Sequence, residues 1–309
     1  MQGGEIVEFN TSAPVTYREL LAGMPAEEHI FGYLFLPKSA GAKPPLVVIS
    51  IGSQGFASGR EDLYSRALTE IGIAAFVVDS FGPRGFSETT SGQGRLSMAG
   101  STADALHAVA HIRHDPRIDS GRIGILGYSR GGHAAVASHH RELQSSVLGR
   151  PDAIAAHVAL YPALNPRWRN PKPTKAPMLM LYGEADDLVP AWKPQACAQE
   201  IEAAGGSIEL LGYADAHHGF DSITAAKSVP SANSSKCTTF IEDNGDIVEQ
   251  GSQIRCDKDW AEFLNSIQKV CGTTGGTVGY GPAPRDVAVG KIQRFFRDNL
   301  IAKSGASRP

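Results

Sequence analysis

The fold is decided by the stretch Arg122-Ile123-Gly124-Ile125-Leu126-Gly127-Tyr128-Ser129-Arg130-Gly131-Gly132-His133-Ala134-Ala135. We expect residues 123–126 to form a short buried strand and residues 131–140 to form a helix of small residues that packs closely on a sheet. Ser129 lies at the tight turn between them. Gly127 and Gly131 have no Cβ, so the strand and the helix can approach each other closely at this turn.

The same turn has the G-x-S-x-G spacing of a nucleophile elbow. In such a turn the serine adopts a strained backbone conformation, and its hydroxyl projects from the edge of the sheet. The N–H groups of Arg130 and Gly131 open the following helix, so they point to where negative charge would develop on a substrate oxygen. Because Gly and Ser are common, an idle serine in a turn would give the same string. The motif therefore needs a base and an acid elsewhere in the chain.

Length and composition restrict the class of protein. The chain has 309 residues, of which 42% are hydrophobic and 20% are charged, and its formal net charge is −3. These values are ordinary for a soluble globular protein and argue against disordered and fibrous classes. The small net charge and the absence of a basic run give no reason to expect nucleic acid or a membrane as a partner. No apolar stretch reaches transmembrane length, and we expect one domain over residues 1–309.

Two features of the sequence bear on the cellular compartment of the protein, and they favour different compartments. Residues 1–7 have neither the basic nor the apolar region of a signal peptide, which favours the cytoplasm. The chain has four cysteines, Cys197, Cys237, Cys256 and Cys271, and three of them lie in one polar segment. Their spacing matches no zinc site, so we expect no metal. The even total of four cysteines, with three of them in this polar segment, favours disulfides and an exported chain instead.

Strands and helices alternate along the chain. The expected strands are residues 6–9, 30–36, 46–51, 73–78, 123–126, 154–160, 178–182 and 207–211. The expected helices are residues 62–71, 102–111, 131–140, 196–203 and 286–300. The first two strands should form a hairpin-like start, and residues 46–51 should form a central strand because they are apolar on both faces. The pattern predicts an α/β fold with a doubly wound, mostly parallel sheet and helices on both of its faces.

An insertion of roughly residues 228–284, rich in Ser, Asn, Asp and Gly, separates the last strand from the closing helix. Asn244-Gly245 lies between two short β-prone runs, which predicts a tight hairpin. A helix should follow, with Asp257 as its cap. The apolar face of that helix comprises Trp260, Phe263, Leu264 and Ile267.

The cysteines of the insertion predict a disulfide. Cys237 and Cys256 flank the expected hairpin, so their backbones can approach each other. Cys256 and Cys271 bracket the expected helix, whose length keeps them apart. We therefore expect a Cys237–Cys256 disulfide, with Cys271 near Cys197 or free.

A serine hydroxyl is a poor nucleophile unless a base, usually a histidine oriented by a carboxylate, takes its proton. In sheets with an elbow the order along the chain is serine, acid, histidine, each on a loop after a later strand. Residues 183–190 follow the strand 178–182, and we select Asp186 there as the acid, with Asp187 and Glu184 as competitors. Residues 213–221 follow the last strand. His218 is selected as the base because it directly precedes Gly219-Phe220, with His217 as the alternative.

Four segments together resemble the dienelactone hydrolase family of α/β-hydrolases. They are Asp79-Ser80-Phe81-Gly82-Pro83-Arg84-Gly85, Gly127-Tyr128-Ser129-Arg130-Gly131-Gly132, Gly183-Glu184-Ala185-Asp186-Asp187 and Ala216-His217-His218-Gly219-Phe220-Asp221. The resemblance covers roughly residues 35–220 and the closing helix. It implies an α/β-hydrolase fold, a Ser or Cys nucleophile with an Asp and a His, no metal or cofactor, and hydrolysis of esters or lactones through an acyl-enzyme. Ser129, Asp186 and His218 match these three roles.

Two departures from that family affect the expected chemistry. The dienelactone enzymes proper use a cysteine where this chain has Ser129, which indicates the wider group of serine esterases. Many relatives carry His-Gly after the third strand, where this chain has Ile51-Gly52. The following loop can still supply a backbone N–H, and we expect the N–H groups of Ser53 and Arg130 to form the oxyanion hole.

Three further residues are candidates for binding the substrate. Arg84 lies in a turn beside the expected cleft, where a guanidinium can hold a carboxylate with two hydrogen bonds. The alternative role for Arg84, and the stronger one, is to fix its own loop through hydrogen bonds to backbone carbonyls. Phe81 and Tyr128 complete the set of expected substrate-binding residues.

The sequence thus predicts a serine carboxylic-ester hydrolase whose partner is a small-molecule ester or lactone of small or medium size. A peptidase or amidase on the same scaffold is the near alternative, which ranks lower because no propeller-like domain is present to restrict the access of peptides. A non-catalytic ligand-binding protein is the distant alternative. The acyl group, the alcohol group and the oligomeric state are not specified by the sequence.

Overall fold

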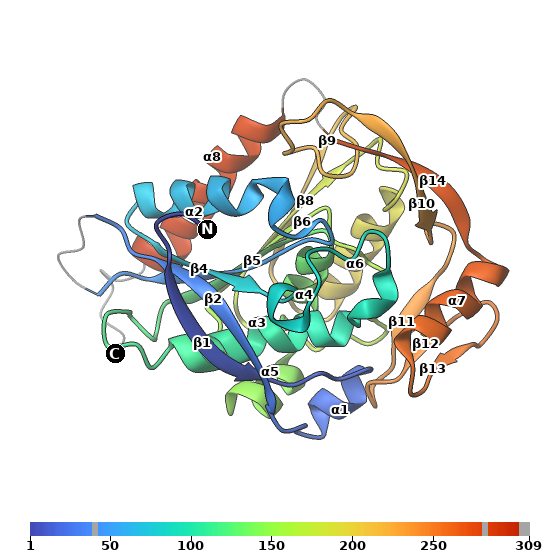
Figure 1. Ribbon diagram of the computed structural model, residues 1–309, viewed down its shortest axis with the longest axis horizontal. Helices are drawn as coiled ribbons and strands as arrows, with labels where there is room; N and C mark the ends of the chain where they lie inside the picture. Colours follow the sequence, from blue (N-terminus) through green and yellow to red (C-terminus); the bar gives the residue numbers. More distant parts are fainter. Residues whose placement is uncertain (39–42, 280–283, 303–309) are drawn as a thin grey trace.

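A computed structural model describes residues 1–38, 43–279 and 284–302 of the chain. Its centre is an eight-stranded sheet in the order β1-β2-β4-β3-β5-β6-β8-β9 (Figure 1). The strands are β1 (Glu5–Thr11), β2 (Glu28–Phe35), β3 (Leu46–Ser50), β4 (Ala74–Asp79), β5 (Ile123–Tyr128), β6 (Ala156–Leu160), β8 (Met178–Gly183) and β9 (Ile208–Tyr213). The six strands from β4 to β9 in this order run parallel, and β1 and β2 form an antiparallel edge. The predicted mostly parallel sheet and its hairpin-like start are confirmed.

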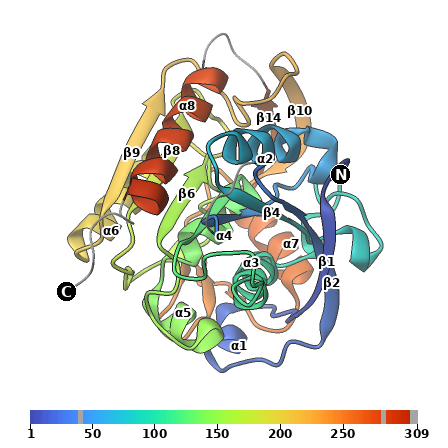
Figure 2. The same ribbon diagram turned by 90° about the vertical axis from the view of Figure 1, so that its left-hand side faces the viewer.

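Helices cover both faces of this sheet, as Figure 2 shows. One face carries α2 (Arg60–Glu70) and α8 (Pro284–Phe296), and the other carries α3 (Met98–Ile112), α4 (Arg130–Ala137), α5 (Arg141–Leu148) and α6 (Trp192–Ala203), with the short α1 (Tyr17–Leu21) beside them. Strand β3 illustrates the arrangement. Val47 and Ile49 pack into one apolar core and Leu46 and Val48 into the other, because successive side chains of a strand point to opposite faces.

Short helical turns lie within the loops around the sheet. They are η1 (Gly55–Ser58), η2 (Gly82–Arg84) and η3 (Gln93–Arg95), and a π-helical turn, η4 (Arg297–Ile301), follows α8. Val287 of α8 is 60% exposed, so it does not belong to the apolar face of the closing helix, whereas Ile292, Phe296 and Leu300 are buried. None of the helices in the three described ranges has the length and apolar character needed to cross a bilayer.

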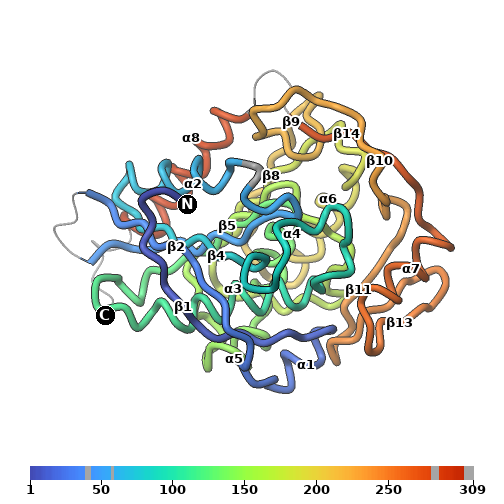
Figure 3. The backbone as a smooth tube through the Cα atoms, in the orientation of Figure 1, coloured from blue at the N-terminus to red at the C-terminus, as the bar shows by residue number. Residues whose placement is uncertain are grey.

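The insertion, together with β7, forms two small sheets beside the large one. Figure 3 traces the backbone of these segments. Strand β10 (Lys227–Asn233) pairs antiparallel with β14 (Thr273–Val278). The second sheet has the order β13-β12-β11-β7 and consists of β7 (Arg167–Trp168), β11 (Thr239–Ile241), β12 (Ile247–Glu249) and β13 (Arg255–Cys256). Strands β11 and β12 form the predicted hairpin, and Gly245 in its turn has φ +86°, a left-handed conformation that favours glycine.

The helix of the insertion is α7 (Trp260–Val270), and its N-cap differs from the prediction. The cap is Asp259, whose side chain accepts a hydrogen bond from the N–H of Glu262, and not Asp257. Trp260, Phe263 and Ile267 are buried and Leu264 packs against the same core, as the apolar spacing predicts. Residues 280–283, at the end of the expected insertion, lie outside the described residues.

The predicted Cys237–Cys256 disulfide is wrong: Cys237 is bonded to Cys271, and Cys256 and Cys197 are buried free thiols. Two features of the strand pairing explain the difference. Cys256 lies on β13, and β12 separates β13 from β11, the strand that Cys237 precedes. The pairing of β10 with β14 brings the end of one strand beside the start of the other, which places the residues just beyond them, Cys237 and Cys271, next to each other.

Candidate active site

The turn between β5 and α4 holds Ser129 in a conformation that non-glycine residues seldom adopt. Its backbone angles are φ 54° and ψ −115°. A Cβ on Gly127 would lie 1.9 Å from the carbonyl oxygen of Gly131, and a Cβ on Gly131 would lie 1.9 Å from that of Ser50. Both glycines are therefore required, because α4 starts in direct contact with β3 and β5. The result is a strained serine at the carboxyl end of the parallel strands.

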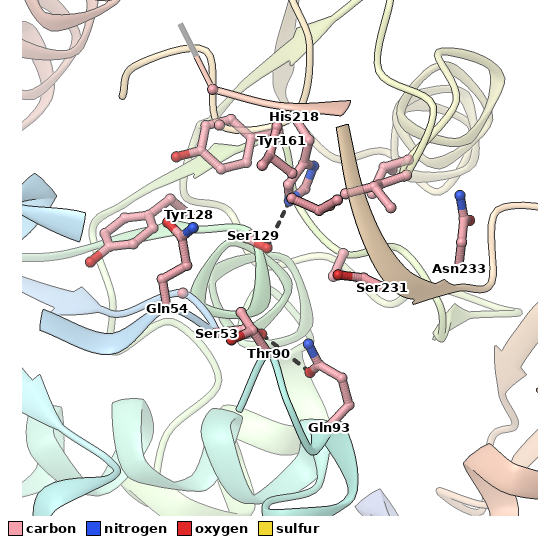
Figure 4. Close-up of a pocket in the computed structure, with 18 of the residues that line it drawn as sticks. Ser53, Gln54, Thr90, Gln93, Tyr128, Ser129, Tyr161, His218, Ser231 and Asn233 are labelled. Carbon is pink, nitrogen blue, oxygen red and sulfur yellow. Dashed lines mark hydrogen bonds between the residues drawn. The ribbon is translucent and has the colours of Figure 1, made fainter. Parts of the chain in front are cut away.

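A chain of hydrogen bonds leads from this serine to a buried carboxylate. The Oγ atom of Ser129 lies 2.9 Å from Nε2 of His218 (Figure 4). Nδ1 of the same imidazole lies 2.8 Å from Oδ2 of Asp186. The other oxygen of Asp186 accepts the N–H groups of Leu188 and Val189 at 2.9 and 2.8 Å. With Nδ1 donating to the carboxylate, Nε2 of a neutral imidazole is free to accept the proton of the serine hydroxyl.

The competing candidates have other contacts. Nδ1 of His217 lies 2.9 Å from the carbonyl oxygen of Ala185. Asp187 is exposed and accepts hydrogen bonds from the backbone N–H and the hydroxyl of Thr277. Glu184 is also exposed. The structure thus brings Ser129, His218 and Asp186 together and leaves the three alternatives outside this chain of hydrogen bonds.

The two expected oxyanion donors lie on opposite sides of the serine in the sequence. Ser53 follows β3 and lines the same cavity as Ser129. Arg130 begins α4, and the N–H groups in the first turn of a helix have no acceptor within that helix. The side chain of Arg130 is 1% exposed and donates to the carbonyl oxygen of Leu96 at 2.8 Å and to Oε1 of Gln93 at 2.5 Å. Burial lowers the pKa of this guanidinium to about 10. Only the backbone of Arg130 is therefore left to contact a substrate oxygen.

Arg84 is engaged by other side chains. Its guanidinium donates to both oxygens of Asp104 at 2.8 and 2.9 Å, to Glu28 at 2.7 Å and to the carbonyl oxygen of Ser80 at 2.7 Å. Among the described residues that line the cavity, neither Arg84 nor Phe81 is present. The geometry favours the structural interpretation of Arg84, with carboxylate partners that the sequence analysis did not foresee.

The aromatic candidates differ from each other. Phe81 is buried and packs against Phe86, with ring centroids 5.4 Å apart. Tyr128 lines the cavity, and its hydroxyl donates to Glu61 in the protein interior. Of the three expected substrate-binding residues, only Tyr128 thus borders the space next to Ser129.

That space is a cavity of about 250 Å³. Its walls come from the loops after β3, β6 and β9, from the segment around Thr90 and Gln93, and from β10 and the end of β14. In Figure 4, Ser231 and Asn233 of β10 lie on the side of the cavity away from Tyr128. No motif in the sequence indicates that β10 belongs to the site. Its position in the chain could have indicated this role, because the insertion begins shortly after the loop that carries His218.

A buried cluster of charged and tyrosine side chains contacts the loop that carries His218. Asp221 accepts hydrogen bonds from Nε of Arg60 at 2.6 Å and from the hydroxyls of Tyr64 at 2.5 Å and Tyr161 at 2.6 Å. Arg60 also donates to the carbonyl oxygen of Gly219 at 3.1 Å. The ring of Tyr161 packs edge-on against His218, with centroids 5.0 Å apart. These contacts limit the movement of the imidazole next to Ser129.

Known proteins provide independent comparisons. The model of the family described as "Dienelactone hydrolase family" matches residues 30–242. An uncharacterised protein of Mycobacterium tuberculosis is 30% identical over 172 residues, which cover 52% of this chain and 59% of that protein. A Methylorubrum extorquens protein named "Putative carboxymethylenebutenolidase" is 24% identical over 234 residues, 69% of this chain and 77% of its own. The match thus spans less than two thirds of the mycobacterial relative.

Solved structures show the same fold. Thermogutta terrifontis esterase 2, phosphorylated by paraoxon, superposes with a TM-score of 0.53 at 20% identity. The superposition covers 72% of this chain and 86% of the esterase chain. Since the identity is low, the likeness concerns the architecture of the α/β-hydrolase fold.

Proposed function

The chain belongs to the dienelactone hydrolase family, and on that premise we propose that it hydrolyses carboxylic esters through Ser129, His218 and Asp186. The observation that carries the proposal is the continuous chain of hydrogen bonds from Ser129 through His218 to Asp186. Its members come from three separate loops at the same edge of the sheet. A structural role alone gives no reason for a strained serine to face a cavity there.

The proposed reaction has two halves. The Ser129 hydroxyl gives its proton to Nε2 of His218 while Oγ attacks the ester carbonyl. The N–H groups of Arg130 and Ser53 stabilise the negative charge on the carbonyl oxygen. His218 then gives the proton to the departing alcohol oxygen, which leaves an ester between the acyl group and Ser129. His218 takes a proton from water as the water oxygen attacks the acyl carbonyl, and the bond from the acyl carbon to Oγ of Ser129 then breaks. The carboxylic acid is released, and His218 returns the proton to Oγ, which restores the free serine.

Asp186 has the role of orienting the imidazole in this reaction. Its side chain has no exposed surface, and one oxygen is already fixed by two backbone N–H groups. The other oxygen holds Nδ1 of His218, which keeps the tautomer that presents a lone pair to Ser129. The carboxylate also stabilises the positive charge that the imidazole acquires in each half-reaction.

The test combines turnover with covalent labelling. The wild-type protein should hydrolyse 4-nitrophenyl esters, and a fluorophosphonate probe should label Ser129, located by mass spectrometry. Ser129→Ala should lose the labelling and lower kcat roughly 10³-fold or more. Ser145→Ala, which changes an exposed serine of α5, is the matched control and should keep both.

Two further substrates separate the alternatives. A lactone tests the ring-opening variant of the same chemistry, and an amide with the same acyl group tests a peptidase or amidase. If the amide is hydrolysed at a rate comparable to that of the ester, the protein is a peptidase or amidase instead. If Ser129→Ala hydrolyses esters as fast as the wild type, the assigned mechanism is rejected.

A further inference from the structure

We infer that the cavity selects esters with a neutral hydrogen-bond-accepting oxygen, such as a hydroxyl or an ether, close to the scissile bond. The selecting groups are the side-chain amides of Gln54 and Gln93. The inference rests on the proposed ester hydrolysis and adds the class of substrate to it.

The orientation of the Gln54 amide is fixed by a cation. Nη1 of Arg60 lies 3.1 Å from Oε1 of Gln54. A guanidinium has only donors, so the atom that faces it must be the amide oxygen. Arg60 is itself held by Asp221 at 2.6 Å. The Nε2 atom of Gln54 must therefore point away from Arg60, and in Figure 4 it lies on the side of the amide toward Ser129.

The Gln93 amide is fixed in the same way by a different cation. Its Oε1 accepts from Nη2 of Arg130 at 2.5 Å and from the hydroxyl of Ser53 at 3.2 Å. The backbone carbonyl of Gln93 accepts from the indole N–H of Trp260 at 3.0 Å, which holds the segment in place. Ser53, an expected oxyanion donor, lies between Gln54 and Gln93 in Figure 4. The two amides thus lie on either side of Ser53 in the lining of the cavity that contains Ser129.

Both amides keep donors for a ligand. Within residues 1–38, 43–279 and 284–302, the Nε2 atoms of Gln54 and Gln93 have no acceptor, and both residues line the cavity. Gln54 is exposed and Gln93 is half-buried, so water can accept from both donors in the free protein, and a substrate that displaces this water removes those hydrogen bonds. A substrate with an acceptor oxygen at this place restores them, whereas a plain alkyl chain does not.

The two buried cations of the cavity, Arg60 and Lys193, are already engaged by protein groups, which favours a neutral acceptor. Arg60 is paired with Asp221. The Nζ atom of Lys193 donates to Oδ1 of Asn165 at 2.7 Å and lies 3.2 and 2.9 Å from the carbonyl oxygens of Ser234 and Cys237, so it is already surrounded by protein acceptors.

Two observations concern charged substrates. Lys227 is the remaining lysine or arginine in the described lining, and it is exposed at the start of β10. No aspartate or glutamate lines the described part of the cavity, so nothing in that lining pairs with a cationic substrate. Gln54 and Gln93 thus offer neutral donors in a lining whose buried cations, Arg60 and Lys193, are already engaged.

The experiment measures a ratio of kcat/KM values. Ethyl butanoate is compared with ethyl 3-hydroxybutanoate and with 2,3-dihydroxypropyl butanoate, each corrected for its rate of hydrolysis by hydroxide. Monoethyl succinate is the anionic comparison. One net hydrogen bond corresponds to a preference of roughly two- to tenfold, so the wild type should prefer at least one hydroxylated ester by that factor.

Variants assign the preference to the two residues. Gln54→Met and Gln93→Met keep the side-chain length without a donor. Gln54→Glu and Gln93→Glu keep an oxygen facing Arg60 or Arg130 and also remove the donor. For at least one hydroxylated ester, each of the four variants should bring the ratio of its kcat/KM to that of ethyl butanoate toward one. Gln250→Met, at an exposed position after β12, should keep the wild-type ratio. A ratio is unaffected by the fraction of each variant that folds.

The outcomes separate this inference from the proposed function. If the wild type cleaves esters but prefers ethyl butanoate or monoethyl succinate, the inference is overturned and ester hydrolysis stands. If the preference persists in all four variants, the assignment to Gln54 and Gln93 is overturned. If no ester is cleaved and Ser129 is not labelled, the proposed function fails and the inference fails with it.

Discussion

The Nζ atom of Lys193 lies 2.9 Å from the carbonyl oxygen of Cys237, and this contact joins the first turn of α6 to the insertion. Cys237 is also bonded to Cys271, just before β14. A buried lysine and a disulfide thus hold the same point of the insertion, next to the end of β10. Since β10 forms a wall of the cavity, both contacts help to determine the shape of the candidate active site.

The buried lysine predicts a pH dependence of stability. Burial, and to a smaller extent the nearby Arg167, lowers the pKa of Lys193 from 10.5 to about 7. Between these values the unfolded chain binds a proton that the native protein lacks, so the free energy of unfolding rises with pH. The expected contribution is at most about 1.4 kcal/mol per pH unit.

Urea unfolding between pH 7.5 and 8.5 measures this slope. The range stays below 9.0, the ordinary thiol pKa, because burial raises the pKa of Cys197 and Cys256 to about 12 and their effect above that pH has the opposite sign. Lys193→Met should lower the slope, whatever its absolute stability. Equal slopes for the variant and the wild type would show that Lys193 does not titrate in this range.

The disulfide predicts a thiol count and a loss of stability. In denaturant without reductant, two thiols per chain should react, those of Cys197 and Cys256. The bond closes a loop with a sequence separation of 34, and opening such a loop costs about 3 to 4 kcal/mol in the chain-entropy model. Cys271→Ala should lower the free energy of unfolding by about that amount. Cys256→Ala is the control for the count, with one reactive thiol and an intact disulfide, and four reactive thiols in the wild type would contradict the pairing.

The features that the sequence predicted depend on residues close together in the chain. The strand and helix periodicities, the glycines around Ser129 and the turn at Asn244-Gly245 each act within a few positions, because backbone geometry is local. The order of serine, acid and histidine placed the candidate residues on successive loops of a parallel sheet. The parallel arrangement then brings the carboxyl ends of those strands to one edge.

The features that were missed or wrong depend on contacts between distant segments. The disulfide follows from the pairing of β10 with β14, which no local pattern indicates. Gln93 and Arg130 are 37 residues apart, and Arg84 and Asp104 are 20 apart. An arginine in a turn has the same local sequence whether it meets a substrate or a buried carboxylate. Only the packing of α3 beneath the turn decides between these roles.

The Arg84–Asp104 pair predicts a structural effect without a change in selectivity. The Asp104 side chain is 1% exposed and also accepts the hydroxyl of Thr11 at 2.9 Å. Arg84→Ala leaves this buried carboxylate without its cation, and breaking such a pair costs about 3 to 5 kcal/mol. Urea unfolding should show this loss, and Arg84→Lys should recover part of it.

Kinetics test the alternative role of Arg84 in substrate binding. Because Arg84 is absent from the described lining of the cavity, Arg84→Ala should change KM for monoethyl succinate and for ethyl butanoate by the same factor. A much larger increase for the succinate ester would instead place the guanidinium in contact with the substrate.

The identity of the base is tested by the two adjacent histidines. His218 lies 2.9 Å from Ser129, whereas Nδ1 of His217 contacts the carbonyl oxygen of Ala185. His218→Ala should therefore lower kcat by several orders of magnitude, and Asp186→Asn should lower it roughly 10⁴-fold because the imidazole loses its orienting partner. His217→Ala removes one hydrogen bond to the backbone and should change kcat less than tenfold. Since triad members act as a unit, adding Ser129→Ala to His218→Ala should lower kcat little further. Loss of activity in His217→Ala with near-normal activity in His218→Ala would show that the base was misassigned, and ester hydrolysis at Ser129 would still stand.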